Sequence, residues 1–158
     1  AAVKLAAKAR VAVTAMADIA AFGGGAPVPL SAVAERQRLS LPFLEQIFSK
    51  LRRAGLVESR RGASGGYVLT RPAEDLTLGE IVAAAEEEVR RTACQPGSGI
   101  GCNGTSARCL THKLWTELDQ HIDAWLSGRT LADIGVDRRA PAAAAAPEGD
   151  QRGEPARV

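Results

Sequence analysis

Residues 41–70, LPFLEQIFSKLRRAGLVESRRGASGGYVLT, decide the fold. In the first part, 41–54, apolar residues recur at i, i+3, i+4 and i+7, which places them on one face of a helix, with polar and basic residues opposite. Gly55 follows, as is typical just beyond a helix C-terminus. Two short runs, 56–60 and 67–70, flank a glycine-rich turn and predict a β-hairpin. The four apolar helix positions are Leu44, Ile47, Phe48 and Leu51.

Two more helices are predicted before this stretch. Residues 4–22 are rich in Ala and lack Gly and Pro, and residues 30–38 form a shorter helical segment. Ser40 is the expected N-cap of the third helix, and Pro42 lies in its first turn, where a missing N–H costs little. Three short helices followed by a hairpin predict a winged helix-turn-helix domain over residues 1–75.

The charge distribution favours contact of this first domain with a polyanion. Residues 1–72 carry a net charge of +7, and residues 73–137 carry −6. In a winged helix the third helix enters the major groove, where Glu, Gln and Ser read base edges, while basic residues meet phosphates and the wing reaches the minor groove. Winged helices also serve as protein-docking modules, which is the main alternative. The candidate DNA contacts are Ser40, Glu45, Gln46, Lys50 and Arg52 in the helix and Arg60, Arg61 and Gly62 in the hairpin.

The second half predicts a helical extension. A capping box at Thr77 opens a connecting helix within residues 76–92. A long helix and a short terminal helix occupy residues 108–137, and the apolar seam of the long helix is typical of a helix that pairs with another. Residues 138–158 lack periodicity and are expected to form a disordered tail. With no apolar run of roughly 18 residues and no signal peptide, we expect a cytoplasmic protein without membrane contact.

Three cysteines and one histidine lie within a short segment between these helices. Cys94, Cys102, Cys109 and His112 have the spacing C-x7-C-x6-C-x2-H, and the loop 93–110 is rich in glycine. Cys109 and His112 are three residues apart at the start of a helix and share a face. The set predicts a metal centre. The wide cysteine spacing favours an iron–sulfur cluster over zinc, whose structural sites normally include a close cysteine pair. Three reduced thiols and a surface histidine are the remaining alternative.

The chain resembles the IscR-type iron–sulfur cluster regulators, a family of winged-helix transcription factors, over roughly residues 3–135. The most specific piece is CLTHKLW (109–115), because many relatives keep three cysteines but the histidine after the third is typical of the IscR type. The other matching pieces are AVTAMADIA (12–20), PVPLSAVAERQ (27–37), LPFLEQIFSKLRRAGLV (41–57) and RGASGGYVL (61–69).

The resemblance implies a function and a set of residue roles. It implies a homodimer that crosses through the long helix, and a cytoplasmic repressor or activator of iron–sulfur assembly genes at a double-stranded DNA operator. Three departures stand out: the cysteine spacings exceed the family's usual five and five, Pro42 replaces a common Ser, and Ala9 and Val11 replace a common Gly and Tyr. The implied ligands of a [2Fe–2S] cluster are Cys94, Cys102, Cys109 and His112, and the implied DNA-reading residues are Ser40, Glu45, Gln46 and Arg61.

Other functional classes are less consistent with the sequence. A nitric oxide or iron sensor of the same family would hold a [4Fe–4S] centre without using His112. A zinc-stabilised DNA-binding or docking protein would carry no cluster. No nucleophile–base pair, phosphate-binding loop or dinucleotide fingerprint is found in the sequence, so we expect neither an enzyme nor a small-molecule substrate.

Overall fold

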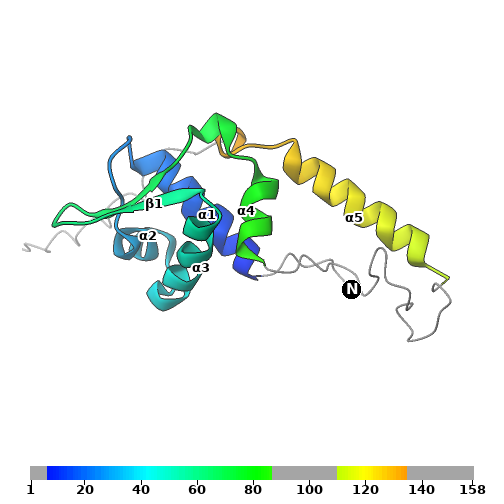
Figure 1. The fold of residues 1–158 in the computed structure, drawn as a ribbon. Helices are drawn as coiled ribbons and strands as arrows, with labels where there is room; N and C mark the ends of the chain where they lie inside the picture. Colours follow the sequence, from blue (N-terminus) through cyan, green and yellow to red (C-terminus); the bar gives the residue numbers. More distant parts are fainter. Residues whose placement is uncertain (1–6, 87–109, 135–158) are drawn as a thin grey trace, which may run out of the picture.

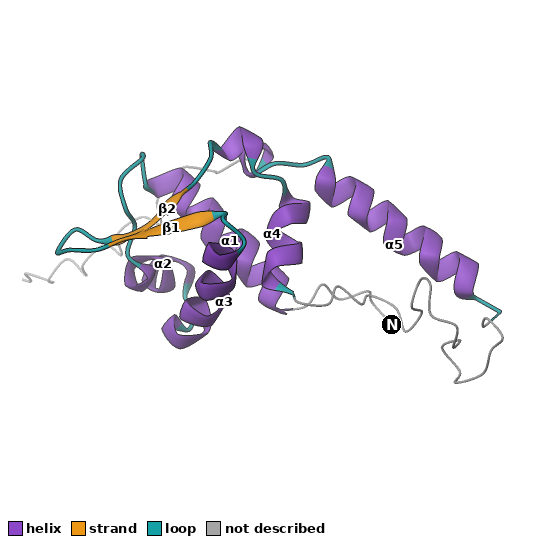
Figure 2. Cartoon of the chain, in the orientation of Figure 1, coloured by secondary structure: helices purple, strands orange, loops and turns teal. Residues whose placement is uncertain are grey.

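The computed structural model describes residues 7–86 and 110–134, and in this part of the chain it is mainly helical with one β-hairpin (Figure 2). Two single-turn 3-10 helices, η1 and η2, complete the described elements. The helices are α1 (Ala7–Phe22), α2 (Leu30–Gln37), α3 (Leu41–Arg53), α4 (Leu78–Ala85) and α5 (His112–Ser127), the strands are β1 (Val57–Arg60) and β2 (Gly66–Leu69), and the single turns are η1 (Ala73–Asp75) and η2 (Leu131–Asp133).

The core lies between α1, α3, α4 and the hairpin. Helix α3 buries the four apolar residues that the periodicity predicts, all at 1% exposure or less. Phe48 also meets Tyr67 of β2 edge to face, with ring centroids 5.0 Å apart. Each fully buried apolar side chain contributes about 1.5–3 kcal/mol, so the inner face of α3 holds it firmly against the body and leaves the other face to solvent.

The helix-turn-helix geometry depends on two short connections. Helix α1 ends before Gly24 and Gly25, which both adopt positive φ angles and allow the chain to reverse. Between α2 and α3, Arg38 adopts φ 53° and ψ 48°, a left-handed conformation that glycine tolerates better than any other residue. Its backbone N–H faces the carbonyls of Ala34 and Glu35 and closes the end of α2. The tight turn sets α3 across α2 directly after Ser40.

The wing is a short antiparallel hairpin with an additional backbone link to the body. Val57 pairs with Leu69 and Arg60 with Gly66, one residue earlier on the second strand than the sequence suggests. Val28, just before α2, exchanges two backbone hydrogen bonds with Tyr67, of 2.9 and 2.8 Å. Gly66 is required here because a Cβ would meet the backbone of Val28. The base of the wing is therefore joined directly to the start of the helix-turn-helix.

Helix α4 begins at the predicted capping box and ends at Ala85. The Thr77 hydroxyl accepts from the Glu80 backbone N–H, and the Glu80 carboxylate accepts from the Thr77 N–H. The Thr77 and Arg71 hydrogen bonds lower the pKa of Glu80. Glu86, just after the helix, is extended, and its N–H donates to the Val82 carbonyl. Residues 87–92 of the predicted connecting helix lie outside the described residues.

Helix α5 leaves the body at an angle and is joined to it at its C-terminal end (Figure 1). The Leu78 N–H donates to the Arg129 carbonyl at 2.8 Å, and the Leu131 N–H donates to the Leu76 carbonyl at 3.0 Å. Only Leu126 is buried in this helix. The predicted residues 108–109 and 135–137 of this region, and the predicted tail 138–158, lie outside the described residues. No described helix has both the length and the apolar character needed to span a bilayer.

Candidate nucleic-acid interface and metal-ligating residues

The outer face of α3 presents the predicted DNA-reading side chains together. Glu45, Gln46 and Arg52 are exposed, and Lys50 is half-buried. Ser40 occupies the N-cap position, but its hydroxyl makes no capping hydrogen bond and so keeps its donor and acceptor for another group. The arrangement places acceptors and donors at the N-terminal half of α3 and positive charge in its last turn. This order suits a helix that reads bases with one end and meets phosphates with the other.

The two wing arginines differ in a way that the sequence does not indicate. Arg60 forms an ion pair with Glu58 at 3.3 Å, and both side chains are exposed. Arg61 lies beyond the strand and makes no ion pair with any residue in the described ranges. Next to it Gly62 adopts φ 120° at the tip. Arg61 therefore carries the more available charge, although an exposed pair such as Arg60–Glu58 weakens the charge of Arg60 only slightly.

A basic hollow connects α3 to the hairpin. It has a volume of about 410 Å³ and is lined by Ser49, Arg52, Arg53 and Tyr67. Two guanidinium groups around one hollow, with the Ser49 and Tyr67 residues beside them, can hold a phosphate oxygen by charge-assisted hydrogen bonds. Arg53 thus joins the basic residues of the predicted interface.

A buried ionic network fixes α2 against α1. The Asp18 carboxylate is fully buried on α1 and accepts three hydrogen bonds from the end of α2. Two come from Arg36 and one comes from the Gln37 amide, and the guanidinium also lies 4.9 Å from the centroid of the Phe22 ring. The Asp18 hydrogen bond raises the pKa of Arg36. Sequence reasoning missed this network, although an aspartate within the apolar stripe of α1 is a signal of a buried partner.

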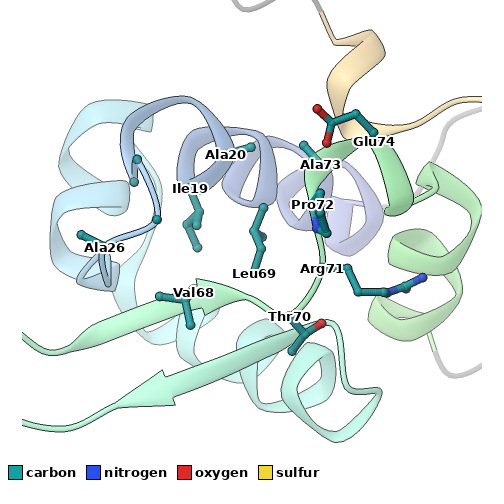
Figure 3. A pocket seen from close by; sticks show the side chains of 13 residues that line it. Ile19, Ala20, Ala26, Val68, Leu69, Thr70, Arg71, Pro72, Ala73 and Glu74 are labelled. Carbon is teal, nitrogen blue, oxygen red and sulfur yellow. The ribbon is translucent and has the colours of Figure 1, made fainter.

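A second hollow lies where α1 meets the base of the wing (Figure 3). It has a volume of about 490 Å³. Ile19 and Leu69 face each other within it, and Thr70, Arg71 and Glu74 also line it. Arg71, at the rim, extends toward α4, where it donates to Glu80 at 2.9 Å. Among the described residues that line this hollow, the one cation is therefore already paired with a carboxylate.

One of the four predicted metal ligands is described. His112 is the first residue of α5 and half-buried, and its carbonyl accepts from the Thr116 hydroxyl at 2.9 Å. Its imidazole forms no hydrogen bond with another described residue, so both ring nitrogens are available to a metal. The predicted ligands Cys94, Cys102 and Cys109 and most of the predicted loop 93–110 lie outside the described residues. Three thiols and an imidazole form a donor set that suits iron–sulfur ligation.

A protein-family model matches residues 5–137 of the chain, and the family is Rrf2, described as an iron-dependent transcriptional regulator. The chain belongs to the Rrf2 family of transcriptional regulators. The match spans the winged helix and α5, so it covers the interface and the His112 end of the molecule alike.

Individual relatives within the Rrf2 family agree with this assignment. The chain is 48% identical to the HTH-type transcriptional regulator IscR of Vibrio parahaemolyticus over 134 residues, which cover 85% of this chain and 78% of that protein. It is 46% identical to IscR of Escherichia coli O1:K1 over 131 residues, or 83% and 79% of the two chains.

Solved structures show the same fold. The structure of T. potens IscR is similar with a TM-score of 0.66 and 37% identity, covering 82% of this chain and 84% of that chain. The structure of CymR, described as the global cysteine regulator of B. subtilis, is similar with a TM-score of 0.66 and 32% identity over 82% and 94%. These findings confirm the predicted winged helix, the resemblance to the IscR type, and a transcriptional regulator rather than an enzyme.

Proposed function

We propose that this Rrf2 protein is an IscR-type regulator that binds a double-stranded DNA operator as a homodimer and senses a [2Fe–2S] cluster. The proposed ligands are Cys94, Cys102, Cys109 and His112. The observation that carries the proposal is the position of His112. His112 is the first residue of α5, and its imidazole forms no hydrogen bond with another described residue. The segment that follows the opposite end of α5 is hydrogen-bonded to the start of α4.

Helix α5 offers a physical connection between the proposed ligands and DNA. Its 16 residues span about 24 Å. At its end, the hydrogen bond from Leu78 to Arg129 fixes it to the start of α4, where Glu80 accepts from Arg71 at the end of the wing. When bound, the cluster would join three thiolates and one imidazole into a single rigid unit at the start of α5. A change in the direction of α5 would then shift α4 and, through the Arg71–Glu80 contact, the residues that follow the second strand of the wing.

The coupling between cluster binding and DNA binding cannot exceed the difference in cluster affinity between the two arrangements of the protein. Ligation shifts DNA binding only if the cluster binds the DNA-competent arrangement more tightly than the other. A coupling of about 1–3 kcal/mol changes operator affinity about 5- to 150-fold. The C-terminal junction supports transmission because it is closely packed: a Cβ on Gly79 would lie 2.8 Å from the Ser127 hydroxyl.

The apolar face of α5 supports the homodimer. Leu114, Trp115 and Trp125 are 58%, 39% and 57% exposed, and Leu118 and Ile122 are only half-buried. These side chains follow the spacing of a helix-pairing seam. A second copy of α5, crossed against the first, would remove this surface from water.

The experiment is an anaerobic purification followed by operator titration. We expect coloured protein with iron and acid-labile sulfide, and different operator affinities for cluster-loaded and apo protein. His112→Ala should change the absorption spectrum, whereas His121→Ala, an exposed histidine on the same helix, should not.

Each contrary result overturns a defined part of the proposal. Colourless protein containing zinc would exclude the cluster. An unchanged His112→Ala spectrum would indicate a cluster that uses cysteines alone, as in the [4Fe–4S] alternative. Identical titration curves for apo and loaded protein at every site would remove the sensing role.

A further inference from the structure

A hollow on α3 includes one residue from α1. The hollow has a volume of about 590 Å³, and every lining residue but one belongs to α3. The exception is Lys8, in the first turn of α1, which lies more than thirty residues earlier in the chain. Helices α1 and α3 are in contact. No sequence motif associates Lys8 with the predicted interface.

The hollow has the composition of a phosphate-facing surface. Its polar lining includes Gln46 and Ser49, and its charged lining includes Lys8, Lys50 and Arg53, with Glu45 as the one acid. Lys8 is exposed and makes no ion pair within the described residues. The first turn of α1 contains no acidic residue either. Three cations around one shallow hollow that adjoins the base-reading residues favour an anionic occupant.

Helical geometry explains why Lys8, and not its neighbour, faces this hollow. Ala9 and Ala12 belong to the buried side of α1, and Lys8 lies beside that side, at the edge nearest α3. Arg10 follows two residues later, about 200° around the helix, and projects into solvent away from the hollow. The chain therefore offers two cations on the same helix turn with opposite directions.

We infer that Lys8 extends the DNA-binding surface of α3 by one backbone-phosphate contact in each protomer. The inference rests on the proposed operator binding. With α3 in the major groove, the hollow on its flank beside the start of α1 would face one of the two sugar-phosphate backbones that border the groove. A lysine ammonium there acts as a point charge on a flexible stem, so it adds affinity that does not depend on base sequence.

The test compares Lys8→Ala with Arg10→Ala and Lys8→Arg in the full chain. The probes are a duplex that the wild-type protein selects from a random-sequence pool and a duplex of scrambled sequence. Each phosphate contact contributes about 0.9 to the slope of log affinity against log salt. Lys8→Ala should therefore flatten the slope by about 1.8 for a dimer, so its deficit should shrink about 12-fold between about 50 and 200 mM salt.

The controls separate the phosphate contact from other causes. We expect Lys8→Ala to weaken binding to both duplexes by the same factor, Lys8→Arg to keep the wild-type slope, and Arg10→Ala to behave as wild type. All variants should melt at the wild-type temperature. A Lys8→Ala slope equal to that of wild type, or a loss confined to the selected duplex, would overturn the inference. Failure of the wild-type protein to enrich any duplex from the random-sequence pool would instead overturn the proposed function.

Discussion

Replacing Asp18 by alanine tests the network that holds the helix-turn-helix together. The carboxylate has no solvent exposure, and its partner Arg36 is 33% exposed. It accepts hydrogen bonds of 3.0 and 2.6 Å from Arg36 and one of 2.7 Å from Gln37. In the Asp18→Ala variant, a guanidinium and an amide at the end of α2 would face an apolar cavity on α1.

The magnitude follows from the burial of the two partners. Removing one member of a fully buried ion pair costs about 3–5 kcal/mol, because the other charge is left uncompensated. Arg36 keeps part of its surface in water and can recover some hydration, which places the expected cost at the low end, about 3 kcal/mol. For a body of this size the corresponding decrease in melting temperature exceeds about 10 °C.

Urea denaturation at fixed protein concentration measures this cost, and a double-mutant cycle with Arg36→Ala measures the pair itself. We expect the double variant to lose less than the sum of the two single variants by about 1–3 kcal/mol, because it leaves neither charge unpaired. Operator affinity of the folded Asp18→Ala protein should also decrease, because α2 is then held less firmly against α1. An Asp18→Ala loss below about 1 kcal/mol, or additive losses, would refute the reasoning.

Four further outcomes are expected. Arg38→Gly should raise the free energy of unfolding by about 0.5–1 kcal/mol in thermal denaturation, because glycine adopts the left-handed conformation without strain; a decrease would contradict this. The contribution of Glu80 to stability is complete above its ordinary pKa of 4.5 and is lost as the pH falls through its lowered folded-state value, so Glu80→Gln should flatten the acid side of the stability curve by less than about 1 kcal/mol. Leu114→Glu should yield monomers in sedimentation experiments, and a persistent dimer would exclude the α5 seam. Arg61→Ala should weaken operator binding more than Arg60→Ala does, and equal losses in titrations would show that the Glu58 pair has no influence.

Much of the fold could be predicted from local sequence patterns. The spacing of apolar residues in α3, the capping box at Thr77, the glycine after α3 and the glycine-rich hairpin tip all involve residues within about four positions of one another. Such patterns act through a single turn of helix or a single pair of strands, so they can be read without the rest of the chain. The cysteine and histidine spacing and the basic first half are also evident from the sequence alone, because they need only a count of residues.

The relations between distant segments required the tertiary structure. Asp18 and Arg36 are 18 residues apart, and Lys8 reaches the surface of α3 from another helix. The junction between α5 and α4 also depends on the packed arrangement. Periodicity records which side of an element is apolar but not which element covers it. Which element covers each apolar face depends on how all the elements pack together in the core, so it can be seen only in the folded chain.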